Sequence, residues 1–418
     1  MTDTPFQIVV FGATSFVGQI LCRYLWSRYG AGGEVKWALA GRSKSKLEQI
    51  RSELGEGAQA LPLILADAAD EQALRALCAQ TRVVISTVGP YALYGSPLVK
   101  VCAETGTDYC DLTGEVPWMA QMIAAHEATA KQTGARIVHT CGFDSVPSDL
   151  GVQFLQEEAA RRYQAPCNTV RMRIAKIKGG LSGGTVASML NMMREVEKDP
   201  SVKRVLTNPF VLTPQGRGPR QPNVNFMAYD KDAGSWLAPF VMASINTRVV
   251  HRSNHLMGMP YGADFKYDEA MMTGTGVKGL ATATALTAGL GGLAVGAAIG
   301  PVRRLLESSV LPRPGEGPSP AEQASGHFDL RFFGRSEDGR TLNARVTGER
   351  DPGYGAAHGL AWADAAIDRG RGARSSGRRC SLCWLKNQRC GLRQKKGLCP
   401  FGVSECLSRS CGCERDCC

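Results

Sequence analysis

Short apolar runs alternate with segments of helical periodicity through the first third of this 418-residue chain. A run of about four to eight apolar residues is typical of a strand buried on both faces, whereas apolar positions about three or four apart indicate an amphipathic helix. The alternation predicts an α/β fold, with a doubly wound parallel Rossmann sheet over residues 1–150. We expect strands at residues 6–11, 35–41, 61–67, 83–89 and 135–141, with helices at 43–54, 70–79, 96–105 and 118–133 between them.

The alternation stops near Gly151, where the pattern changes to that of a second, α+β domain over residues 151–355. Two alternating runs there flank the dipeptide Asp338-Gly339, which is a strong hairpin signal. We expect this hairpin to extend the sheet of the second domain. Further expected elements are a strand at 168–179, helices at 185–196 and near 237–251, and a Pro/Gly linker at 312–323.

The second domain contains an apolar segment at residues 278–300, of which 280–300 carry no charge. Its length admits a membrane span. Ala, Gly and Thr dominate its composition, so a buried or membrane-surface hairpin broken near Gly291-Gly292 is an equal alternative. The N-terminus shows no signal-peptide pattern. We therefore expect a cytoplasmic protein, with association with the inner face of the plasma membrane as the alternative.

The net charge of +11 is concentrated at one end of the chain. Residues 371–418 hold 11 Lys/Arg and 3 Asp/Glu, which leaves a net charge of +3 for residues 1–370. A cationic body would favour an anionic partner. The observed distribution instead argues against a nucleic-acid partner.

Nine of the 15 cysteines lie between Cys380 and Cys418, in a tail (356–418) rich in Arg, Gly and Ser. A zinc-binding or disulfide-rich appendage is one explanation, since Cys380 and Cys383 have ligand spacing. The later spacings are irregular, so we favour a frameshifted or disordered terminus that starts near residue 356. The six cysteines of the body follow no pattern, as expected of thiols in a reducing compartment.

The candidate cofactor site begins at GATSFVG, which follows the first strand and opens the first helix. Gly12 permits the tight turn, and Gly18 lets the helix pack on the strand while backbone N–H groups face a pyrophosphate. Ser15 replaces the glycine that is usual in the middle of such a turn and offers a hydroxyl donor. The pattern predicts a dinucleotide site, with an ordinary strand-to-helix turn as the alternative. The candidate residues of the turn are Gly12, Thr14, Ser15, Phe16, Val17 and Gly18.

The end of the second predicted strand indicates which dinucleotide binds. An NAD site usually presents an acidic side chain there, which binds the ribose 2′-hydroxyl. No acidic residue lies between Val35 and Leu47, and Arg42 and Ser43 occupy the position instead. A guanidinium group suits a 2′-phosphate. The sequence therefore predicts NADP as the cofactor.

Two further loops follow predicted strands at the carboxyl edge of the sheet, where cofactors and substrates bind in this class of fold. The first places Gly89 at this edge as a cofactor contact and Tyr91 as a substrate or nicotinamide contact, although a plain strand-terminating turn is the alternative. The second places Asp144 and Ser145 after the last strand. Tyr91, Asp144 and Ser145 are the catalytic candidates, but Asp144 equally suits a helix cap.

Two other chemistries lack support in the sequence. The Tyr-x-x-x-Lys pair of short-chain dehydrogenases is absent, which argues against that family. His251 and His255 are four apart and could share a helix face, but a third ligand is not evident. We therefore predict no metal site in the body.

Several motifs together resemble those of the saccharopine dehydrogenase-like oxidoreductases, in particular their trans-acting enoyl reductase branch. They are GATSFVG, LAGRS, STVGPY, DYCDLTGE and CGFDSVPSD, and the resemblance continues through SGGTVAS (182–188) and DPGYG (351–355), over residues 5–356 in all. It implies that NADP is held by Gly12, Thr14, Ser15, Gly18, Arg42, Thr87 and Gly89. It also implies that the substrate is approached by Tyr91, Asp144, Ser145 and the loop 182–185. In that branch an apolar helix follows DPGYG, and this sequence lacks it.

The resemblance implies an NADPH-dependent reductase of an enoyl or keto group in a lipid- or polyketide-like substrate. Hydride transfer is the chemistry of the cofactor, so the protein has to orient the ring, exclude water and supply a proton. One alternative is a membrane-associated NADP-binding scaffold or sensor without activity. The other is a saccharopine-type amino-acid dehydrogenase, for which the second domain offers no concentrated Arg/Lys cluster. The expected partners are a small lipid-like molecule, a membrane surface and a second copy of the chain.

Overall fold

The structure is a computed structural model that describes residues 4–143, 145–180, 183–299, 316–356 and 402–404. Its first sheet contains the strands β1 (Phe6–Phe11), β2 (Trp37–Gly41), β3 (Leu63–Leu65), β4 (Thr81–Ser86), β5 (Asp108–Cys110) and β6 (Ile137–Val138). All pairs are parallel and the order is β3-β2-β1-β4-β5-β6, as in the predicted Rossmann sheet. The order reverses between β1 and β4, which is where open α/β sheets bind ligands.

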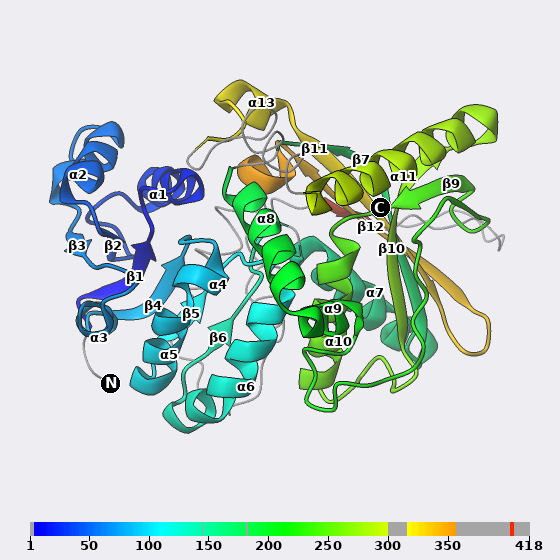
Figure 1. The fold of residues 1–418 in the computed structure, drawn as a ribbon, viewed down its shortest axis with the longest axis horizontal. Coiled ribbons are helices and arrows are strands. Elements are labelled where there is room, and N and C mark those ends of the chain that lie inside the picture. Colours follow the sequence, from blue (N-terminus) through cyan, green and yellow to red (C-terminus); the bar gives the residue numbers. More distant parts are fainter. Residues whose placement is uncertain (1–3, 144, 181–182, 300–315, 357–401, 405–418) are drawn as a thin grey trace, which may run out of the picture.

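Helices cover both faces of this sheet (Figure 1). They are α1 (Phe16–Tyr29), α2 (Lys44–Glu53), α3 (Glu71–Cys78), α4 (Tyr91–Tyr94), α5 (Ser96–Thr105) and α6 (Val116–Thr133). On one face α1 and α2 bury Leu25 and Leu47, and on the other α3 and α5 bury Leu74 and Val99. These apolar stripes fix the helices, and with them the loops at the carboxyl edge of the sheet.

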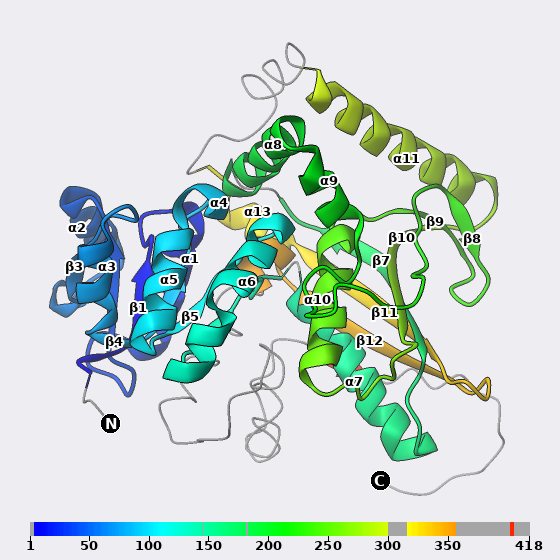
Figure 2. The same cartoon turned by 60° about the horizontal axis from the view of Figure 1, so that its bottom comes forward.

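A second, mixed sheet lies beside the first domain (Figure 2). Its strands are β7 (Thr169–Lys178), β8 (Ala228–Asp230), β9 (Ser235–Pro239), β10 (Lys266–Gly274), β11 (His327–Arg335), β12 (Thr341–Glu349) and β13 (Gly402–Ser404). The order is β13-β12-β11-β7-β10-β9-β8, in which β7 and β10 are parallel and the other pairs antiparallel. This arrangement confirms the expected α+β character of the region.

Further helices follow the first domain in the chain. They include α7 (Val146–Tyr163), α8 (Gly183–Lys198), α9 (Pro200–Thr207), α10 (Ala243–Leu256) and the short α13 (Pro320–Ser325). Helix α7 contacts β11 and β12, while α10 contacts α7 and β10. Phe332 of β11 and Tyr267 of β10 are fully buried in the resulting core.

The predicted hairpin is confirmed. Strands β11 and β12 pair in register around a turn in which the Ser336 amide donates to the Arg340 carbonyl at 2.9 Å. Gly339 has a φ of +85°, which explains why glycine occupies this position.

The sequence-based expectations differ from the structure at two strands. Strand β5 was not expected, because three residues with a polar start give no clear apolar run. The helix near 237–251 is wrong in its first part, where Ser235–Pro239 is strand β9 and helix α10 begins only at Ala243. Pairing with β10 stabilises this short run as a strand, and Pro239 has no N–H to continue a helix.

The apolar segment forms one continuous helix, α11 (Gly276–Ala298), so the expected break at Gly291-Gly292 is wrong. It packs along β9 and β10 through side chains such as the fully buried Ala283. None of the helices in the described ranges is long and apolar enough to cross a membrane.

Of the predicted tail, the structure describes Ala356 and Gly402–Ser404, and Gly402–Ser404 pairs with the edge of β12. The zinc, disulfide and frameshift interpretations of residues 357–401 and 405–418 lie outside the described residues, as does most of the linker at 312–323.

Candidate active site

Two glycines shape the turn between β1 and α1. Gly12 has a φ of +89°, a left-handed conformation that other residues rarely adopt. A Cβ atom on Gly18 would lie 2.2 Å from the carbonyl oxygen of Gly12, so α1 can approach the turn this closely only with glycine there. Both positions meet the demands of a dinucleotide-binding turn.

The first turn of α1 leaves backbone N–H groups unpaired. None of the described residues accepts a hydrogen bond from the amides of Thr14, Phe16 or Val17. Unpaired N–H groups and the positive end of the helix dipole make such a turn an anion site. These three amides therefore fit the pyrophosphate of a dinucleotide.

Ser15 serves inside the turn. It caps α1 by accepting a hydrogen bond from the Gly18 amide at 2.9 Å. Its hydroxyl also lies 2.9 Å from that of Thr87, which donates to the Gly12 carbonyl at 2.9 Å. Because the proton of Thr87 is directed to Gly12, the proton between the two hydroxyls belongs to Ser15. The hydroxyl that the sequence offers to the cofactor thus joins α1 to the end of β4.

Arg42 lies at the same edge of the sheet as the turn. The amides of Gly12 and Ala13 both donate to the Ala40 carbonyl, at 2.9 and 3.2 Å, which fixes the end of β2 beside the turn. Arg42 follows with an exposed side chain, and Ser43 caps α2. No side chain in the described ranges pairs with the Arg42 guanidinium. This free cation suits the 2′-phosphate of NADP.

Two segments of the second domain close over the turn. The ring of Phe16 packs edge-to-face against that of Tyr354, with centroids 5.2 Å apart. The buried carboxylate of Asp351 holds this contact in place by accepting hydrogen bonds from the amides of Gly180 and Tyr354, at 2.8 and 2.9 Å. The Tyr354 hydroxyl lies 3.3 Å from that of Thr185 in α8. The motifs SGGTVAS and DPGYG therefore meet at the cofactor turn.

Buried Glu115 holds the loop after β4. Its carboxylate accepts hydrogen bonds from the amides of Tyr91 and Ala92, at 2.8 and 2.9 Å. Ser188 of α8 donates to the same carboxylate at 2.8 Å, which anchors the second domain beside Gly89. Burial raises the pKa of Glu115, and the three hydrogen bonds act in the opposite direction. In both views α8 lies between the first domain and the second sheet (Figures 1 and 2).

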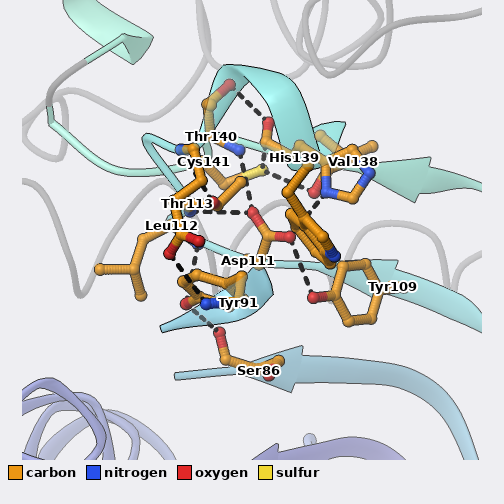
Figure 3. Close-up of polar contacts among 12 residues, drawn as sticks. Ser86, Tyr91, Tyr109, Asp111, Leu112, Thr113, Val138, His139, Thr140 and Cys141 are labelled. Carbon is orange, nitrogen blue, oxygen red and sulfur yellow. Dashed lines mark hydrogen bonds and ion pairs between the residues drawn. The ribbon is translucent and has the colours of Figure 1, made fainter. Parts of the chain in front are cut away.

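Tyr91 bridges the ends of β4 and β5. Its side chain is buried, and its hydroxyl donates to the Ser86 carbonyl at 3.1 Å and accepts from the Leu112 amide at 3.4 Å (Figure 3). Both functions of the hydroxyl are therefore used within the protein. The position beside Gly89 supports a role in holding this loop, and a direct part in catalysis stays a prediction.

Figure 3 shows Asp111 at the centre of a hydrogen-bonded network. Its fully buried carboxylate bonds the Tyr109 hydroxyl at 2.9 Å and Nδ1 of His139 at 2.6 Å. It also accepts hydrogen bonds from the amides of Thr113 and Thr140, at 3.0 and 3.1 Å. Sequence reasoning missed this group. The available signal was that Asp111 and His139 each directly follow a strand at the carboxyl edge.

Ser145 connects the end of the first domain to the second. Its buried hydroxyl donates to Oδ1 of Asn246 in α10 at 2.9 Å, and the Asn246 amide donates to Glu269 of β10 at 2.9 Å. Asp144 and Ser182 lie outside the described residues. The catalytic assignments of Asp144 and Ser145 therefore stay predictions.

The chain shares its first domain and most of its length with known proteins. Residues 8–138 match the model of the saccharopine dehydrogenase NADP-binding domain. A Mycobacterium tuberculosis protein provisionally named as a trans-acting enoyl reductase is 41% identical over 368 residues, which cover 85% of this chain and 87% of that protein. This chain belongs to the saccharopine dehydrogenase-like oxidoreductases, in the trans-acting enoyl reductase branch. It is therefore an NADP-dependent oxidoreductase.

Two further relatives of this oxidoreductase differ greatly in their distance from it. The trans-acting enoyl reductase of Mycobacterium leprae is 37% identical over 383 residues, which cover 88% of this chain and 90% of that protein. The apo structure of saccharopine dehydrogenase from Saccharomyces cerevisiae aligns with a TM-score of 0.47 at 12% identity, over 92% of this chain and 97% of that one.

The two histidines considered as metal ligands do not form a site in the described part of this oxidoreductase. His251 is buried against the rings of Phe210 and Phe265, with centroids 4.5 and 5.9 Å away. Burial lowers its pKa to about 4, so the ring is neutral at physiological pH. Across the described ranges, no three His, Cys, Asp or Glu side chains gather as metal ligands would.

Proposed function

We propose that this oxidoreductase reduces the carbon–carbon double bond of an enoyl thioester with a lipid- or polyketide-like acyl chain. The observation that carries the proposal is the contact between the aromatic rings of Phe16 and Tyr354 at the cofactor turn. Helix α8 adds the hydroxyl of Thr185 beside that of Tyr354, and the hydroxyl of Ser188, which donates to Glu115. Aromatic rings and hydroxyls suit contact with an apolar acyl chain. The names of the relatives agree with enoyl reduction.

Buried Arg173 of the second domain is not available to an amino-acid substrate. Its guanidinium is held between Asp230 at 2.8 Å and Asp268 at 3.0 Å. The Arg248 guanidinium donates to the Leu206 carbonyl but has an Nε without a partner in the described ranges. A saccharopine-type substrate needs free cations for several carboxylates, and Arg173 is not one of them.

Different residues at the carboxyl edge of the first sheet would bind and orient the cofactor. The amides of Thr14, Phe16 and Val17 would hold the pyrophosphate, and Arg42 the 2′-phosphate. Bound NADPH supplies the hydride. The loop after β4, fixed through Glu115, would orient the reactive end of the cofactor.

Turnover assays test the proposal. The purified protein is mixed with NADPH and a medium-chain trans-2-enoyl thioester of coenzyme A, and NADPH oxidation and the saturated product are measured. A β-ketoacyl thioester and an amino-acid substrate pair serve as comparisons. Preferential reduction of the enoyl thioester supports the proposal. Preferential reduction of the keto group, or tight NADPH binding without any turnover, contradicts it and favours the keto reductase or the scaffold respectively.

We also propose that the protein meets its lipid-like substrate at a membrane surface, through α11. Val277 and Val295 at the two ends of the helix are 84% and 63% exposed. Exposed Phe226 and Met227 lie next to it, since Thr284 of α11 donates to the Met227 sulfur at 2.9 Å. Exposed apolar groups gathered in this way are typical of interaction surfaces.

A further inference from the structure

Five titratable side chains lie buried or nearly buried at the carboxyl ends of β4, β5 and β6. The hydroxyls of Tyr91 and Tyr109 are hydrogen-bonded, and both carboxylate oxygens of Asp111 and of Glu115 accept hydrogen bonds. The fifth is His139, whose Nδ1 bonds Asp111 while no described residue hydrogen-bonds its Nε2. Nε2 is not among the described polar atoms that are both fully buried and without a partner, so it keeps some accessible surface. Among the hydroxyl, carboxylate and imidazole groups of these five described side chains, Nε2 is therefore the polar atom that remains available to a ligand.

Asp111 fixes the protonation and orientation of the ring. A carboxylate can only accept a hydrogen bond, so Nδ1 of His139 carries a proton that points to Asp111. Nε2 is then the ring nitrogen that can exchange a proton with a ligand or with solvent. When Nε2 also carries a proton, that proton is the one the ring can donate, because the Nδ1 proton stays hydrogen-bonded to Asp111. The ring is further held by Tyr109 of β5 and by the uncharged indole of Trp118 of α6, with centroids 5.9 and 5.0 Å away. The Cys141 thiol faces the His139 backbone carbonyl, at 3.9 Å.

The backbone at His139 is held in an uncommon conformation. Thr140 has a φ of +57°, although β-branched residues rarely adopt the left-handed region. Its amide donates to Asp111 at 3.1 Å and its hydroxyl donates to the His139 carbonyl at 2.7 Å. Strain of this kind persists where the surrounding contacts require it, and it concentrates at ligand sites. The loop is thus built to keep His139 and Asp111 together.

The pair is connected to the cofactor loop. Tyr91 follows Gly89 by two residues, and its hydroxyl accepts the amide of Leu112, the neighbour of Asp111 (Figure 3). The loops that carry Asp111 and His139 lie at the sheet edge where ligands of this fold bind.

We propose that His139 is the catalytic residue that supplies the proton of the reduction, with Asp111 as its positioning residue. The inference rests on the proposed enoyl reduction. Hydride addition to one carbon breaks the double bond, and its electron pair forms a new C–H bond at the neighbouring carbon with the proton on Nε2. The Nε2–H bond breaks, its electrons stay on the imidazole, and solvent returns the proton. NADPH is oxidised and the alkene is reduced, so the step balances.

The test compares His139→Gln and His139→Asn with His126→Gln, a matched histidine change on α6 outside the network. General acids contribute about 100-fold or more to rate. We expect kcat for the enoyl thioester to fall by ~100-fold in both His139 variants, with KM and the dissociation constant of NADPH within about 3-fold of wild type. In D2O, wild type should place deuterium on one face of the protonated carbon, whereas the His139 variants should lose that selectivity. His126→Gln should behave as wild type.

Two measurements separate the proposed role from a structural one. In Asp111→Asn the His139 ring loses its carboxylate acceptor, so kcat should fall while the dissociation constant of NADPH stays within about 3-fold of wild type. Nitrogen NMR of the histidines in the cofactor-free protein should show His139 as the Nδ1–H tautomer in wild type. A kcat within 3-fold of wild type in folded His139 variants, or unchanged deuterium selectivity, overturns the assignment of His139 while the reductase function stands. If wild type reduces no enoyl thioester, the proposed function fails and this inference with it.

Discussion

The hydroxyls of Ser15 and Thr87 lie 2.9 Å apart and join the cofactor turn to the end of β4, across 72 positions of sequence. The Thr87 hydroxyl donates its own hydrogen bond to the Gly12 carbonyl, so the shape of the turn depends on a side chain at the end of another strand. Ser15, in the middle of the turn, therefore has a structural role that glycine could not fill. Its hydroxyl connects the two loops that flank the point where the strand order reverses.

Replacing Thr87 tests this link. Thr87→Val keeps the shape of the buried side chain but removes its hydrogen bond to the Gly12 carbonyl, which still accepts from the Ser15 amide, so the cost is about 0.5–1.5 kcal/mol of unfolding free energy. We expect NADPH binding to weaken by ~10-fold, measured by fluorescence titration, because the turn loses its fixed geometry. Thr87→Ser retains the hydroxyl and should bind NADPH as wild type does. A Thr87→Val variant that binds NADPH as tightly as wild type would show that the hydroxyl is not needed.

Arg42 decides between the two nicotinamide cofactors. Arg42→Ala removes the free cation beside the turn, and a charge-assisted hydrogen bond contributes about 1.5–3 kcal/mol. We expect the dissociation constant of NADPH to rise by ~10- to 100-fold while that of NADH changes little. Lys36→Ala, an exposed cation at the opposite end of β2, is the matched control. A variant that keeps the NADPH preference of wild type would refute the cofactor assignment.

The first sheet could be predicted from the sequence because its parallel strands are continuous apolar runs. Strand β5 could not be predicted because it begins with Asp108 and has only three residues, so pairing with β4 and β6 determines its position. Strand β9 could not be predicted for a related reason. Its residues precede α10 and have a composition that suits a helix or a strand, and pairing with β10 makes them a strand.

The cofactor turn was predictable because Gly12 and Gly18 answer local backbone demands that a sequence displays. The pairing of Asp111 with His139 could not be predicted, because the two residues are 28 positions apart and strand β5, which precedes Asp111, was not expected from the sequence. The contact between Glu115 and Ser188 depends on how the domains pack, which no local pattern contains.

Ser188 tests the closure of the two domains. Ser188→Ala removes the hydrogen bond from the Ser188 hydroxyl to the Glu115 carboxylate. We expect the free energy of unfolding to fall by about 1 kcal/mol. Because Glu115 keeps its two backbone donors, NADPH binding should change little. We expect kcat/KM for the enoyl thioester to fall by ~5-fold. Ser244→Ala, at an exposed serine of α10, is the control, and a loss of similar size there would remove the case for a specific interdomain contact.

The membrane proposal concerns the exposed end of α11. The double change Leu293→Ser and Val295→Ser replaces two exposed apolar side chains without touching the buried Ala283. Cosedimentation with phosphatidylglycerol-containing vesicles should fall by ~10-fold or more, since each fully buried side chain contributes about 1.5–3 kcal/mol. Activity on a short, soluble enoyl thioester should stay unchanged. Wild-type protein that does not sediment with vesicles, or a variant that binds as wild type does, argues against α11 as the contact.

Glu269 gives the second domain a pH-dependent stability. Burial raises its pKa from 4.5 to about 7, against the opposing hydrogen bonds from Tyr267, Asn246 and Ser148. The folded state therefore holds the proton more tightly than the unfolded state, so this contribution is fully present below pH 4.5 and is lost as pH rises through 7. The whole shift corresponds to about 3 kcal/mol, as an upper bound.

Glu269→Gln removes this titration and keeps an acceptor for the Tyr267 hydroxyl. Urea unfolding at a series of pH values between 4.5 and 9 should show a smaller loss of stability with rising pH in the variant, by up to about 3 kcal/mol. The comparison uses the pH dependence and not the absolute stability, because other buried carboxyl groups titrate equally in both proteins. Glu349→Gln, at an exposed glutamate of β12, should keep the wild-type pH dependence. Parallel curves for wild type and Glu269→Gln would mean that Glu269 is ionised in the folded protein throughout this range, stabilised by its three donors.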